Sequence, residues 1–180
     1  VSYLTGKQVG SPAYNRAIGG TTAHQFSAGD SSAENRRYLI KAYNSSTDGY
    51  LFWMYGLNDS YSGLGHTFDT ATYRTAINNW LDTALGSRVN WPANQIVISG
   101  PSWTRDTKYG GFAGAMRYYN LVAVDVAAKR GVIGVNMYDS MAARGGPALL
   151  LENPGDSVHP SAYGHVVMAQ IFFHVLAKNG

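Results

Sequence analysis

The chain has 180 residues, of which 45% are hydrophobic and 13% aromatic, enough for one domain with a substantial core. Its formal charge is +3, but no basic run alternates with aromatic residues, so nucleic acid is not an expected partner. The absence of Cys excludes disulfides, thiolate nucleophiles and cysteine metal sites. No apolar run reaches membrane length and no signal peptide is present, so we expect a soluble protein without a membrane partner.

Three short apolar segments predict a parallel sheet. Residues 50–55, 96–99 and 132–135 are rich in β-branched or aromatic residues, and Gly, Asn, Asp or Ser follows each of them. Strands that are covered on both faces have this composition. We expect residues 50–55 to form the first of these strands and polar loops to follow their carboxyl ends.

Segments in which apolar residues recur with helical spacing lie between the predicted strands and after the last of them. Residues 70–85 and 112–129 carry this pattern, with Asp69 as a candidate N-cap for the first helix. A last apolar helix is predicted for residues 162–178, after Pro160. The alternation predicts a single domain over residues 1–180, a three-layer α/β/α sandwich with a mainly parallel sheet.

Three polar loops are expected at the carboxyl ends of the strands, where open parallel sheets bind ligands. They are Asn15-Arg16-Ala17-Ile18-Gly19-Gly20-Thr21-Thr22, Gly56-Leu57-Asn58-Asp59 and Asp156-Ser157-Val158-His159-Pro160. In this order the three blocks resemble the glycine loop, the Gly-x-Asn-Asp loop and the Asp-x-x-His-Pro loop of the SGNH (GDSL-type) serine hydrolases. The resemblance spans nearly the whole chain and implies a flavodoxin-like fold of the SGNH type.

The resemblance implies a role for four residues. His159 would take the proton from a serine hydroxyl, and Asp156 would orient the imidazole and stabilise its cation. The backbone N–H of Gly20 and the side-chain amide of Asn58 would form the oxyanion hole. The expected reaction is cleavage of a carboxylic ester through an acyl-enzyme, without cofactor or metal, on a small acyl ester or an acetylated carbohydrate.

The Gly-Asp-Ser nucleophile turn of the family does not precede the glycine loop. Only fourteen residues precede Asn15, and residues 1–10 resemble the helix and connection that follow that turn. A Gly-Asp-Ser triplet ends at Ser31, but it lies after the glycine loop and no buried strand precedes it. We therefore expect the first strand to be missing and the nucleophile to come from an upstream peptide or a second chain, with Ser31 as a weaker candidate.

Two other functions remain open at this stage. The chain is alternatively an inactive domain of the same fold that binds carbohydrate or supports assembly, or a fragment of a split esterase. Single Asn-Asp and Asp-x-x-His motifs are usually turns or caps, so only their order favours catalysis. The remaining histidines share no metal-ligand spacing with carboxylates and are interpreted as surface or packed side chains: His24, His66, His165 and His174.

Overall fold

The structure is a computed structural model that describes residues 21–26, 40, 42–60, 68–104, 114–149 and 158–179. The predicted alternation of strands and helices is confirmed, with short 3-10 helices (η) between them. The described elements in chain order are η1 (Ala23–Phe26), β1 (Leu51–Met54), η2 (Asn58–Ser60), α3 (Thr70–Leu85), η4 (Ala93–Gln95), β2 (Ile96–Ser99), α4 (Ala115–Arg130), β3 (Ile133–Val135), α5 (Met137–Ala142), η5 (Gly146–Leu149) and α6 (Ala162–Asn179).

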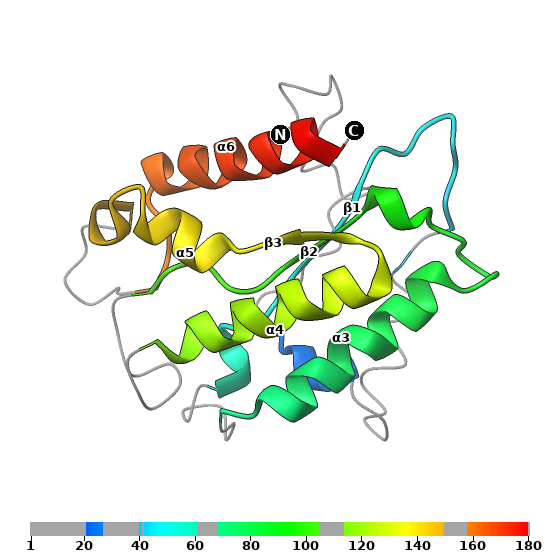
Figure 1. The fold of residues 1–180 in the computed structure, drawn as a ribbon, viewed down its shortest axis with the longest axis horizontal. Coiled ribbons are helices and arrows are strands. Elements are labelled where there is room, and N and C mark those ends of the chain that lie inside the picture. The colour runs from blue at the N-terminus through cyan, green and yellow to red at the C-terminus, as the bar shows by residue number, and fades with distance from the viewer. Residues whose placement is uncertain are drawn as a thin grey trace.

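The three strands form a parallel sheet in the order β1-β2-β3. Leu51 pairs with Ile96, and Ser99 pairs with Val135. Because the strands are parallel, their carboxyl ends meet at one edge of the sheet. Figure 1 shows the chain leaving the strands toward the left of the view, and the orange segment that leads into α6 lies on the same side.

Helices cover both faces of the sheet. Trp53, Ile96 and Ile98 point toward α3 and α4, whereas Val97 on the same central strand packs with α5 and α6. This alternation follows from the two-residue period of a strand. In Figure 1 helices α3 and α4 lie below the sheet and α6 lies above it, which gives the three layers that the sequence predicts.

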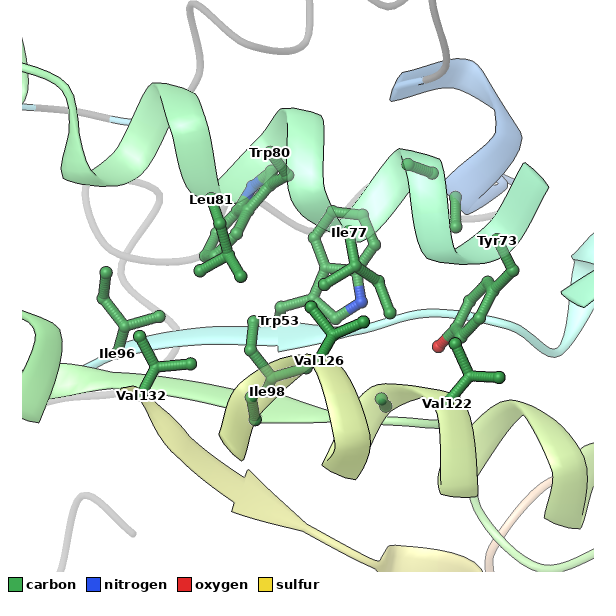
Figure 2. Packing of buried hydrophobic residues seen from close by; sticks show 14 of the residues in the cluster. Trp53, Tyr73, Ile77, Trp80, Leu81, Ile96, Ile98, Val122, Val126 and Val132 are labelled. Atoms are coloured by element: carbon green, nitrogen blue, oxygen red, sulfur yellow. The ribbon is translucent and has the colours of Figure 1, made fainter. Parts of the chain in front are cut away.

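The core between the sheet and α3 is aromatic. The rings of Trp53 and Trp80 lie 5.1 Å apart, and those of Tyr73 and Tyr119 lie 4.4 Å apart. Figure 2 shows Trp53 between β1 and the inward side chains of α3, with Ile98 of β2 beside them. Trp53 is 1% exposed. Trp53 and Trp80 thus both belong to the core.

Local capping explains where the long helices begin and end. The Asp69 carboxylate accepts from the N–H groups of Ala71 and Thr72, at 2.9 and 3.1 Å, which confirms the predicted N-cap of α3. Gly131 ends α4 in a left-handed conformation with φ 65°, and β3 follows almost at once. Among the described residues, no helix is long and apolar enough to cross a membrane.

Candidate active site

The chain leaves β1 through a turn that favours glycine at residue 56. Gly56 has a φ of 122°, and a Cβ at this position would lie 2.8 Å from Cδ of Pro101 in the loop after β2. The hydroxyl of Tyr73 donates to the carbonyl oxygen of Tyr55 at 2.9 Å. Contacts from α3 and from the loop after β2 therefore fix the start of the segment that carries Asn58.

Asn58 joins this segment to the end of the predicted glycine loop. Its Nδ2 donates to the carbonyl oxygen of Thr21 at 3.2 Å. Thr21 directly follows Gly20 in the sequence, and its side chain is buried. One N–H of the amide is used in this bond, and the amide group carries a second N–H. The structure thus brings Asn58 to the segment that the sequence assigns to the same oxyanion hole.

Asp59 anchors the residues that follow Thr21. Its carboxylate accepts from the backbone N–H of Ala23 at 2.9 Å and from that of His24 at 2.8 Å. The Nδ1 atom of His24 lies 2.8 Å from Oδ1 of Asp59. The Asp59 side chain is fully buried, so these groups replace the water that a carboxylate would otherwise bind.

The same buried carboxylate acts on a neighbouring phenol. Burial raises the pKa of Tyr73 well above its ordinary value, and the nearby charge of Asp59 raises it further. The Tyr73 hydroxyl therefore stays protonated at neutral pH and remains the donor to Tyr55. The geometry of the turn before Asn58 depends on this protonated form.

His159 is exposed and lies two residues before Ser161, which caps α6. The Ser161 hydroxyl accepts from the N–H of Gly164 at 3.0 Å, and its own backbone N–H donates to the carbonyl oxygen of Leu149 at 2.8 Å. A Cβ on Gly164 would lie only 2.1 Å from that oxygen, so glycine is needed for the close approach. The cap and the bond to Leu149 fix where the chain carrying His159 enters α6.

Asn120 organises the loop after β2. This fully buried side chain donates from Nδ2 to the carbonyl oxygen of Pro101 at 2.7 Å, and its Oδ1 accepts from the N–H of Tyr138 at 3.2 Å. Trp103 follows in this loop, with its ring 6.4 Å from that of Tyr138 and only 3.3 Å from where a Cβ on Gly146 would lie. Trp103 is therefore packed at the carboxyl edge of the sheet rather than isolated on the surface.

The structure describes two of the four residues predicted for catalysis. Asn58 and His159 are described, and both lie in segments that follow or border the carboxyl edge of the sheet. Gly20 and Asp156 lie outside the described residues, as does Ser31. The bond between Asp156 and His159 and the approach of His159 to Asn58 stay predictions.

Sequence reasoning missed the roles of two residues at this site. Asp59 was considered only as part of the Gly-x-Asn-Asp motif, and His24 was interpreted as a surface or packed side chain. The adjacent Asn-Asp pair is a signal that Asp59 has a partner of its own, because two polar side chains after a buried strand can serve two different partners, but the sequence carries no signal for His24 as that partner. No group of three or more potential metal ligands occurs among the described residues.

The sequence matches the GDSL-like lipase/acylhydrolase family over residues 2–167. The chain belongs to this family. The match confirms the resemblance drawn from the three sequence blocks, and it places the Asn58 segment within the family-matched region. A search of curated proteins gave no match.

Three solved structures with a similar fold are variants of an esterase from Geobacillus. A variant of an acetyl-xylooligosaccharide esterase from Geobacillus aligns with a TM-score of 0.57 and 18% identity, over 87% of this chain and 68% of that chain. A second variant of that esterase aligns with the same TM-score and coverage at 19% identity. A catalytic mutant of the enzyme, described as an acetylxylan esterase from Geobacillus stearothermophilus, aligns equally well at 17% identity. These similarities confirm the SGNH hydrolase fold.

Proposed function

We propose that this member of the GDSL-like family is a serine esterase that removes short acyl groups, in particular acetyl groups, from carbohydrate. The observation that carries the proposal is the bond from Asn58 to Thr21, which unites the family's Asn-Asp loop with the end of its glycine loop. An oxyanion hole needs two hydrogen-bond donors that are held in place and directed at the same oxygen atom. The bond to Thr21 holds the Asn58 side chain, one of the two expected donors, in place.

The proposed chemistry is acyl transfer in two steps. A serine hydroxyl attacks the ester carbonyl while His159 takes its proton, and Asp156 holds the imidazole in the required tautomer. The N–H of Gly20 and the second N–H of Asn58 stabilise the oxyanion. His159 then gives this proton to the oxygen of the leaving group, which departs as the alcohol and leaves an acyl-enzyme. In the second step water attacks the acyl-enzyme, His159 takes the proton of the water, and the acid is released.

The substrate class rests on fold similarity and on the residues near the site. The similar Geobacillus enzyme is an esterase of acetylated xylo-oligosaccharides. In this chain Trp103 and Tyr138 lie at the carboxyl edge of the sheet, where aromatic rings can contact a sugar. Together these observations favour an acetylated carbohydrate over a long-chain lipid.

The source of the nucleophile is part of the proposal. Within the described residues β1 pairs with β2 and marks the border of the sheet, so a strand carrying the serine turn would pair along its other side. We assign the nucleophile to a serine on such a strand, supplied by an upstream segment or a second chain, and keep Ser31 as the alternative. The Ser31→Ala variant separates the two, because only the alternative predicts loss of activity.

The test measures hydrolysis of p-nitrophenyl acetate and acetate release from acetylated xylo-oligosaccharides. Asn58→Ala should lower kcat about 100-fold with little change in KM, because the lost donor acts in the transition state. His159→Ala should reduce the rate to background. His174→Ala is the matched control, since this histidine is exposed on α6 and should leave the rate unchanged.

Three outcomes would contradict the proposal in different ways. Activity that survives in both Asn58→Ala and His159→Ala would show that these residues are not the site. Loss of activity in Ser31→Ala, with the fold intact, would refute a nucleophile outside the chain. Binding of acetylated xylo-oligosaccharide without acetate release, even after addition of any encoded segment that precedes Val1, would identify an inactive carbohydrate-binding domain.

A further inference from the structure

Two segments far apart in the sequence are joined by four polar contacts. Asn58 donates to the Thr21 carbonyl, and Asp59 accepts from the N–H groups of Ala23 and His24, across 35 to 37 positions in sequence. The His24 ring makes the fourth contact, with 2.8 Å between Nδ1 and Oδ1 of Asp59. We call this set, residues 58–59 with residues 21–24, the loop clamp.

The loop clamp contains a carboxylate that requires all its partners. Asp59 is fully buried, and the His24 side chain is 17% exposed. Burying a carboxylate is costly unless hydrogen bonds or an opposite charge compensate it, and two backbone N–H groups supply only part of that compensation. The His24 ring, whose Nδ1 lies 2.8 Å from Oδ1, is a further polar group that this segment places against the Asp59 carboxylate.

The clamp contains one of the two expected oxyanion donors, Asn58, and directly follows the other, Gly20, in the sequence. Neighbouring residues of one short turn, Asn58 and Asp59, bind neighbouring residues of another, and Gly20 immediately precedes the bound segment. A shift of residues 21–24 relative to residues 58–59 would therefore move the chain that follows Gly20 relative to Asn58. Misplacement of this kind by less than an ångström is enough to weaken transition-state stabilisation.

We propose that His24 is a positioning residue for ester hydrolysis, which holds Asp59 and thereby fixes residues 21–24, the segment that follows Gly20, against Asn58. This inference rests on the proposed esterase function. The ring need not touch the substrate, because its effect passes through the Asp59 carboxylate to the backbone of Ala23 and His24. Since the oxyanion exists only after attack on the ester, loss of the ring should act on kcat and leave KM nearly unchanged.

The kinetic test compares two replacements of the same ring. His24→Ala should lower kcat for p-nitrophenyl acetate about tenfold, because it loosens the oxyanion hole without removing a donor. His24→Asn should restore most of the rate, since its amide nitrogen occupies the branch from Cγ that Nδ1 occupies in histidine. His174→Ala, at an exposed position of α6, is the control for general loss of a histidine.

A second measurement does not require activity. In His24→Ala, the backbone N–H groups of Ala23 and residue 24 should exchange with solvent at least tenfold faster by NMR, while N–H groups of β2 keep their protection. His24→Asn should return the two rates toward those of the wild-type chain. Melting temperatures of all variants establish that they remain folded, and His24→Asn keeps the comparison meaningful if the alanine variant unfolds.

The two measurements separate failure of this inference from failure of the proposed function. An unchanged kcat in His24→Ala, or a loss that His24→Asn does not reverse, would overturn the positioning role in an active enzyme. If the wild-type chain shows no more activity than His159→Ala, the esterase proposal fails, and the exchange rates still decide whether His24 holds the loop. Unchanged exchange at Ala23 and residue 24 would then refute the clamp.

Discussion

Replacing Asn120 with alanine should lower the free energy of unfolding by about 3 kcal/mol. The side chain is 0% exposed and bonds to the Pro101 carbonyl, the Tyr138 N–H and the Met116 carbonyl. Met116 lies one helical turn before Asn120, so its carbonyl keeps the helix bond when the side chain is removed. The Pro101 and Tyr138 groups each lose a partner, at roughly 1–3 kcal/mol for a buried unsatisfied group.

Urea denaturation followed by tryptophan fluorescence measures this loss, because Trp53 and Trp80 are buried beside the sheet. Asn179→Ala is the matched control. Its side chain also donates to a carbonyl one helical turn earlier, that of Val175, but from an exposed position, so the change should stay within about 0.5 kcal/mol. A loss of less than about 1 kcal/mol for Asn120→Ala would show that water replaces the missing amide and would refute the reasoning.

Three further changes test the turns that surround the site. Gly56→Ala should destabilise the fold by roughly 2–4 kcal/mol, through its φ of 122° and the contact of the new Cβ with Pro101, whereas Gly49→Ala, with open space around it, should be nearly neutral in the same denaturation assay. Burial raises the pKa of Tyr73, so the folded state holds this proton more tightly than the unfolded state, and stability should fall as the pH rises above the ordinary tyrosine value of 10.0. Thermal melts at alkaline pH should show a smaller fall in stability for Tyr73→Phe than for the wild-type chain. Ser161→Ala should lower stability by about 1 kcal/mol through loss of the α6 cap, and a melting temperature equal to wild type would contradict the capping role.

The sequence predicts the layers of this fold because local and long-range signals agree. Short runs of β-branched and aromatic residues become β1, β2 and β3, and Asp69 caps α3 as expected. The predicted second helix starts at residue 112, which lies outside the described residues, and α4 as described begins at Ala115, after Gly114 with a φ of 86°. Helix α5 was not predicted, since six residues are too few for a clear helical period.

The site was only partly predictable from the sequence. The order of the three blocks identified Asn58 as a donor near the glycine loop, and its bond to Thr21 agrees with that expectation. The partnership of Asp59 with His24 has no local signal, because His24 belongs to a short 3-10 helix in a segment without apolar periodicity. Asp59 and His24 are 35 positions apart and meet because two turns pack together. A periodicity pattern read over a short stretch of sequence cannot reveal such a contact.

The two faces of the sheet differ in how firmly their helices are held. Helices α3 and α4 share an aromatic core and are also linked by Arg130, which bonds to Asp82 at 2.6 Å. Five of the 18 residues of α6 are buried, compared with six of 16 in α3 and eight of 16 in α4, and α6 leaves Tyr163 62% exposed. Less buried surface means a lower free energy of local opening, so α6 should detach in fluctuations that leave the other face intact. The segment that carries the expected base precedes α6, so we expect the lifetime of the assembled site to depend on the docking of α6 rather than on global unfolding.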